Sequence, residues 1–283
     1  MPRLADITSF RRDLLFNGAV QLSWLETNRQ LADKAAEHFA FHGPRYHGVT
    51  RDALQADGHQ LVDTASFTLD LLQRLIGRRP GDPFLLAVAG YGTGKSHLGV
   101  TLASLLGAPD SPLAARIIAN IRDAEPPIGD EVQSILDGLG QPFLVVALNG
   151  MKDFDLTAEV VRQVMVALRE RGLDTSPLED LRPRFRQALR SITEEIFNAF
   201  RDEFQREFGA ECHREEILER LSQQDEEAFR RVHDIFERRI GWAIHAAGQE
   251  SLHDFLRVVR ETYCGEDKRF AGLLILFDEF GRY

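Results

Sequence analysis

The sequence is poor in three features that each define a large class of proteins: cysteine, long apolar runs and an excess of positive charge. Its 283 residues include only two cysteines, Cys212 and Cys264, which lie far apart and without CxxC spacing. This pattern predicts two reduced thiols rather than a disulfide or a metal site. The neighbouring pair Cys212-His213 has no second pair to complete four ligands, so we do not expect zinc.

Long apolar runs are also missing. No stretch reaches the roughly 18 apolar residues of a transmembrane helix, and the start, MPRLADITSF, lacks the basic-then-apolar layout of a secretory signal. We therefore expect a cytoplasmic protein with no membrane partner. The chain is 43% hydrophobic and 28% charged, which is typical of a globular protein with one large domain or one domain carrying a sizeable insertion.

Positive charge is outnumbered, since 44 acidic residues face 34 basic ones and the net charge is −10. A protein whose main surface binds nucleic-acid phosphates usually carries the opposite excess. The basic residues alternate with acidic ones, as in EDKR, which is typical of solvated helix faces. Charge therefore gives no support to a nucleic-acid partner, although that alternative stays open.

Apolar spacing predicts an alternation of helices and strands in the first half of the chain. It indicates helices over 31–39, 61–76 and 95–107, with a buried apolar strand at 84–89 before the third. Ser111-Pro112 has the form of an N-cap and a first-turn proline that open a further helix. Strands follow at 143–148 and, in the run GLLILF, at 272–277. Because parallel strands need long crossovers and are buried on both faces, this order predicts a parallel α/β core.

The stretch from about 155 to 264 shows no strand signal. Its apolar residues recur at helical spacing, and a stripe of phenylalanines within it has the spacing of a core rather than of a ligand-stacking surface. Ser251 and Asp254 stand in capping-box spacing at the start of a last helix. We therefore expect a long all-helical insertion that interrupts the α/β core.

The segment AGYGTGKS, residues 89–96, matches the phosphate-loop pattern, with alanine in the first position where glycine is commoner. Its glycines allow turns that aim successive N–H groups at one point, and the following helix N-terminus completes a site for phosphate. The lysine places a charge on the β- and γ-phosphates, and the serine hydroxyl coordinates Mg²⁺. We therefore expect ATP and Mg²⁺ to bind at Ala89, Gly90, Tyr91, Gly92, Thr93, Gly94, Lys95, Ser96 and His97.

The last residue of that set, His97, follows the motif on the first helical turn. It has two interpretations, a contact with nucleotide or partner and a packing role, and packing is favoured.

The chain ends in LLILFDEFGRY, where an apolar strand delivers two carboxylates. Ligands of open α/β sheets bind at the carboxyl ends of the strands, so Asp278 is placed to hold Mg²⁺. Glu279 is then expected to orient and deprotonate the attacking water as a general base. A strand that simply ends in solvated acids is the alternative, and the phosphate loop makes it the minor one.

An Asp-Glu pair after an apolar strand resembles the ATPases with an additional catalytic glutamate, and the AAA+ family in particular. The resemblance covers residues 84–107, 143–150 and 272–280. It implies a P-loop NTPase core with a parallel sheet, and it implies that Asn149, which ends the second strand, senses the γ-phosphate and restrains Glu279. It also implies that the loop FHGPRYHG, residues 41–48, grips the nucleotide base through Phe41 or Tyr46.

A metal site built from His42 and His47 of that loop is a weaker interpretation. Lys95 and Asp278 lie further apart in sequence than a compact core of this family requires, which supports an insertion between them. We expect an N-terminal helical segment with the base loop over 1–80, the first half of the ATPase core over 81–151, the insertion over 152–264, and the last core strand over 265–283.

The stretches GYGTGKSHL and FDEFGRY resemble the large ATPases of bacterial phage-defence systems of the BREX type. This resemblance implies an incomplete core within a longer polypeptide, protein partners in a multi-subunit system, and weak activity of the present chain alone. Association with copies of itself also fits.

Three functions compete at this point. The first is an ATPase that couples hydrolysis to remodelling of a protein or nucleic-acid partner, and the second is a nucleotide-dependent scaffold or switch with little turnover. Glu279 favours the first, because a pure switch needs no general base. A small-molecule kinase is the weakest of the three.

Overall fold

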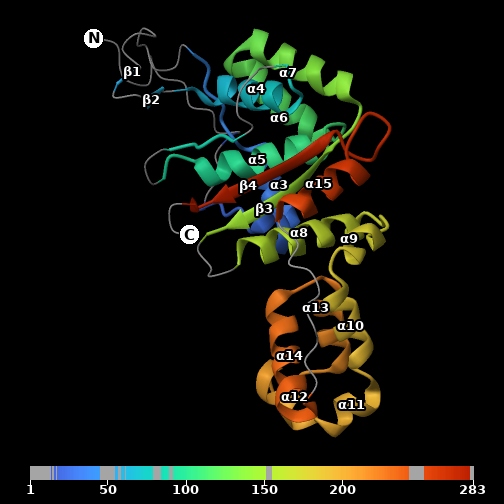
Figure 1. The fold of residues 1–283 in the computed structure, drawn as a ribbon. Helices are drawn as coiled ribbons and strands as arrows, with labels where there is room; N and C mark the ends of the chain where they lie inside the picture. Colours follow the sequence, from blue (N-terminus) through green and yellow to red (C-terminus); the bar gives the residue numbers. More distant parts are fainter. Residues whose placement is uncertain are drawn as a thin grey trace, which may run out of the picture. The chain divides into compact units, whose positions relative to one another are not determined.

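The computed structural model of the chain describes residues 14, 16, 18–44, 55–56, 59–60, 62–78, 84–88, 92–150, 155–241 and 252–280. Some residues named above lie outside these ranges: Tyr46, His47, Ala89, Gly90, Tyr91 and Ser251. The chain divides into two compact units (Figure 1). One comprises Met1–Met151 and Arg269–Tyr283, and the other comprises Lys152–Lys268.

The described part of the first unit contains helices and two pairs of strands. The described helices are α2 (Trp24–Thr27), α3 (Arg29–Glu37), α4 (Thr64–Leu75), α5 (Lys95–Gly107), α6 (Pro112–Ala124) and α7 (Pro126–Leu139). The predicted cap of α6 is confirmed, since Ser111 Oγ accepts a hydrogen bond from the Ala114 N–H at 3.1 Å. Apolar spacing alone does not predict α7 or the short antiparallel pair β1 (Gln55–Ala56) and β2 (His59–Gln60).

A parallel pair of strands lies in this unit, β3 (Phe143–Asn149) and β4 (Gly272–Asp278). More than 120 residues separate them in sequence, so the predicted parallel α/β arrangement is confirmed in this coarse form. The register pairs Val145 with Leu274 and Ala147 with Leu276. These four side chains share one face of the pair, and they pack against a core cluster that includes residues of α3, α5, α6 and α7.

The strand predicted at 84–89 is not formed by the residues of this range that the structure describes. Residues 84–88 form neither strand nor helix, and the side chains of Phe84, Leu86 and Val88 are 61%, 61% and 77% exposed. An apolar run makes a strand only where another strand offers its backbone N–H and C=O groups for pairing. Among the described residues the sheet contains β3 and β4 alone, and 84–88 does not pair with either of them.

The second unit is built from helices, as its apolar spacing predicts. They are α8 (Leu156–Glu170), α9 (Ser176–Asp180), α10 (Pro183–Ser191), α11 (Glu194–Ala199), α12 (Arg201–Phe208), α13 (Arg214–Ser222), α14 (Glu226–Ile240) and α15 (Leu252–Tyr263). The predicted phenylalanine core is confirmed, because the rings of Phe185, Phe204 and Phe236 are at most 2% exposed and belong to one cluster. Arg182 and Arg184 both pair with Glu226 at the edge of this cluster.

No helix in the described part of the chain is both long and apolar enough to cross a membrane.

Candidate nucleotide site

The start of α5 has the backbone that a phosphate site needs. Gly92 and Gly94 adopt the left-handed conformation, with φ of +77° and +88°, and Gly94 is the N-cap of the helix. Glycine reaches this region without the steric cost that a side chain adds. The first N–H groups of a helix have no acceptor within it, and together with the helix dipole they favour an anion. Lys95 and Ser96 stand in this first turn, so the described part of the motif fits a phosphate group.

His97, on the same turn, is held by the protein itself. Its Nε2 lies 2.6 Å from the carbonyl oxygen of Ala35 in α3, and its ring stands edge-on to Phe39 with centroids 4.9 Å apart. A carbonyl can only accept, so Nε2 carries the hydrogen. Burial lowers the pKa of His97 below its usual 6.5, the bond to Ala35 opposes this shift, and the neighbouring His38 adds to it. This geometry agrees with the packing interpretation and ties α3 to the start of α5.

The strand ends bring two of the predicted polar residues together. Asn149 and Asp278 are the last residues of β3 and β4, and the parallel register pairs them directly. Side chains alternate along a strand, so both belong to the face that carries Val145, Ala147, Leu274 and Leu276, the face packed against the helical core.

Helix α5 brings its first turn to the same end of the unit. A Cβ added to its last residue, Gly107, would lie 3.6 Å from Cγ2 of Val145, so the helix ends over the middle of β3. A helix of this size is about 20 Å long, and the four residues from Val145 to Asn149 span about 13 Å. Figure 1 shows α5 returning against the strand direction, so its start and the strand ends both lie at the left of the view.

Glu279 follows Asp278 in an unusual conformation. Its φ is +57°, in the left-handed region that residues other than glycine seldom enter. Its N–H donates to Oδ1 of the preceding Asp278 at 3.0 Å. The Gly150 N–H donates to the carbonyl oxygen of Asp278 at 2.9 Å, which joins the two strand ends beyond their last pair. No role for Gly150 was predicted from the sequence, where the available signal was a glycine directly after a buried strand with a polar end.

The region predicted to hold the nucleotide base is packed where it is described. Phe41 is 7% exposed and meets Phe39 edge-on, with ring centroids 4.8 Å apart. The His42 N–H donates to Oγ1 of Thr64 at 2.8 Å, which fastens this segment to the start of α4. Phe39 in turn reaches within 3.9 Å of a Cβ added to Gly94. These contacts place Phe39 beside the start of α5, and they leave Phe41 little surface for stacking.

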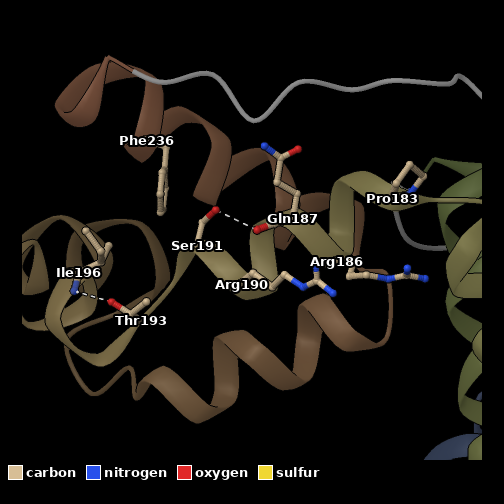
Figure 2. A pocket seen from close by; sticks show the side chains of 8 residues that line it. All are labelled: Pro183, Arg186, Gln187, Arg190, Ser191, Thr193, Ile196 and Phe236. Carbon is tan, nitrogen blue, oxygen red and sulfur yellow. Dashed lines mark hydrogen bonds between the residues drawn. The ribbon is translucent and has the colours of Figure 1, made fainter.

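A separate cleft of about 680 Å³ lies within the second unit (Figure 2). It is lined by α10, by Thr193 and Ile196 at the start of α11, and by Phe236 of α14. Ser191 closes one side by donating to the carbonyl of Gln187 at 2.9 Å. None of the predicted site residues lines this cleft.

A magnesium site with nucleotide needs few protein ligands. Mg²⁺ keeps several waters and takes its other oxygens from phosphates and one or two side chains. In the described ranges no group of three or more His, Cys, Asp or Glu side chains could hold a metal ion. The expected set, the Ser96 hydroxyl in the first turn of α5 and the Asp278 carboxylate at the end of β4, has the oxygen chemistry that Mg²⁺ requires.

No protein-family model, no curated protein and no solved structure matches this chain.

Proposed function

We propose that this chain binds Mg·ATP at the start of α5 and hydrolyses it. One juxtaposition supports the proposal above all others. The left-handed Gly92 and Gly94 lead into Lys95 and Ser96 at the helix start, and the same end of the unit carries the strand ends with Asn149 and Asp278. An anion site beside carboxylate and amide oxygens is the combination that a metal-bound phosphate group needs.

Each residue has a distinct task in this proposal. Backbone N–H groups around Gly92 and Gly94 bind the β-phosphate, and Lys95 neutralises charge on the β- and γ-phosphates. Asn149 orients the γ-phosphate and the side chain of Glu279. When bound, Mg²⁺ withdraws charge from the phosphate oxygens, with Ser96 and Asp278 as its protein ligands.

Glu279 acts on the attacking water. As the water oxygen forms its bond to the γ-phosphorus, the bond between that phosphorus and the β–γ bridging oxygen breaks. The proton lost by the water passes to the Glu279 carboxylate, and the products are ADP and inorganic phosphate. No oxidant or reductant takes part.

The wider role follows from the resemblance to AAA+ and BREX-type ATPases. We propose that ATP turnover drives remodelling of a protein or nucleic-acid partner, in a multi-subunit system that acts in antiviral defence. A scaffold or switch that binds ATP with little turnover is the alternative, and the two differ in whether Glu279 changes the rate of phosphate release.

Replacing Lys95 with alanine tests the nucleotide site. We expect Mg·ATP affinity, measured by calorimetry, to fall at least about 100-fold, because loss of a charge paired with phosphate costs a few kcal/mol and 1.4 kcal/mol is tenfold. Lys34→Ala is the matched control, since Lys34 is an exposed lysine of α3 outside the site. Equal affinities in the Lys95→Ala and wild-type chains would remove the phosphate loop from the proposal.

A further inference from the structure

Gly150 and Glu279 lie close together where the two strands end. A Cβ added to Gly150 would lie 2.6 Å from the carbonyl oxygen of Glu279 and 3.1 Å from its carbonyl carbon. It would also lie 3.2 Å from Cε2 of Phe277. The two nearest atoms belong to the backbone, so no side-chain rotation could make room for a methyl group there. Space for the Glu279 peptide therefore depends on glycine at position 150.

Backbone conformation gives no other reason for glycine there. Gly150 is not among the glycines with positive φ, so its φ does not require glycine. The residue that does adopt the left-handed conformation is its neighbour, Glu279, where the side chain makes that conformation unfavourable. The unusual backbone and the missing side chain thus occur on opposite sides of one contact.

Such a conformation persists only where the surroundings hold it. Three contacts do so here. The Glu279 N–H donates to Oδ1 of Asp278, the Gly150 N–H donates to the Asp278 carbonyl, and the Glu279 carbonyl packs against Gly150. Together they determine the direction in which the Glu279 side chain leaves the end of β4.

We propose that Gly150 is a positioning residue for the general base, because its missing side chain and its N–H hold Glu279 in the left-handed conformation that directs the carboxylate at the attacking water. This inference rests on the proposed hydrolysis. It assigns no contact between Gly150 and nucleotide. It predicts instead that a methyl group at position 150 displaces Glu279 and leaves the phosphate loop intact.

Kinetics of Gly150→Ala test the proposal. Under single-turnover conditions, which measure slow hydrolysis as well as fast, we expect the rate of phosphate release to fall about 10- to 100-fold, since a misplacement near 1 Å can cost that much. The Kd for Mg·ATP should stay within about twofold, because the change does not reach the phosphate loop. Gly138→Ala in α7 is the matched control, as a Cβ there meets nothing within 4 Å.

Two further measurements separate positioning from a general loss of structure. In a Glu279→Gln background, Gly150→Ala should cause no additional loss of rate, since residues that act through one another are not additive. The Glu279→Gly variant should unfold about 2–4 °C above Glu279→Ala. Glycine adopts the left-handed conformation without the steric cost that the alanine side chain adds. The melting comparison needs no activity, and it stands even where Gly150→Ala fails to fold.

The outcomes distinguish this inference from the proposed function. A wild-type chain that binds ATP and releases no phosphate overturns both. If the wild-type chain hydrolyses ATP and Glu279→Gln does not, an unchanged rate in Gly150→Ala overturns the positioning role alone. Additive losses in the double variant, or equal midpoints for the glycine and alanine variants at 279, also overturn it.

Discussion

Two residues other than glycine adopt the left-handed conformation in the described part of the chain. Gln224 lies in the second unit, which we call the helical unit, and Glu279 lies in the first, which we call the α/β unit. Their φ angles are nearly equal, at +59° and +57°. Gln224 follows the end of α13, where its N–H donates to the Leu221 carbonyl and the next N–H, of Asp225, donates to the Arg220 carbonyl. This is a Schellman cap, which satisfies the last carbonyls of a helix through one left-handed residue.

Glu279 has no helix end behind it. It follows the strand β4, and its conformation depends on a contact with Gly150, which precedes it by more than 120 residues in sequence. The same backbone angle therefore has a local explanation in one unit and a long-range one in the other. An unusual backbone conformation that neighbouring residues do not explain indicates a functional site more strongly than one that they do explain.

Substitution of the two carboxylates at the end of β4, Asp278 and Glu279, should give the largest effect and tests the functional side of this comparison. Glu279→Gln keeps the shape and removes the proton acceptor, so the single-turnover rate should fall about 100- to 10,000-fold with ATP affinity retained. Asp278→Asn should instead weaken the Mg²⁺-dependent part of ATP affinity as well as the rate. If a Glu279→Gln chain releases phosphate at the wild-type rate, the left-handed conformation of Glu279 has no catalytic role, as at Gln224.

A second prediction uses His97, a half-buried histidine of the α/β unit. Because burial lowers the pKa of His97, the unfolded chain binds a proton at this position more readily than the folded chain does. The stabilising contribution of neutral His97 is fully present above its unfolded pKa of 6.5, and it is lost as pH falls through that value toward the lowered one.

Chemical denaturation between pH 8 and pH 5 measures this effect. The loss of stability over that range should be smaller in His97→Phe, which keeps a ring against Phe39 and cannot titrate. His253→Phe is a suitable control, since His253 is an exposed histidine of α15 in the other unit. Parallel pH profiles for wild type and His97→Phe would contradict the prediction.

The smallest effect is expected at Gln224, the left-handed residue whose conformation the helix cap explains. Its side chain is 1% exposed, and its Oε1 meets Arg182 at a long 3.4 Å. Its Nε2 has no hydrogen-bond partner among the residues that the structure describes. Gln224→Gly removes the steric cost that a side chain adds in the left-handed conformation, and it removes an unsatisfied buried donor. We therefore expect the free energy of unfolding to rise by about 1 kcal/mol. ATP affinity should not change. A clear loss of stability would show that packing of the buried side chain outweighs both terms.

Much of the helical structure could be predicted from short stretches of sequence. The cap at Ser111, the phenylalanine core of the second unit and the two strands β3 and β4 all follow from patterns within a few residues. So does the phosphate-loop motif, whose described glycines have the backbone that the motif requires. The prediction of a strand at 84–89 was wrong. An apolar run can form a strand, but it does so only where a neighbouring strand is placed to pair with its backbone.

The sequence by itself determined the parts of this protein that depend on contacts between near neighbours: helix periods, caps and the glycines of the loop. Only the tertiary structure decided that Asn149 lies opposite Asp278, that Gly150 meets the Glu279 peptide, and that His97 bonds to Ala35 of α3. Each of these contacts joins residues more than 60 positions apart. Strand register and helix packing bring them together, and neither is encoded in the residues adjacent to the contact.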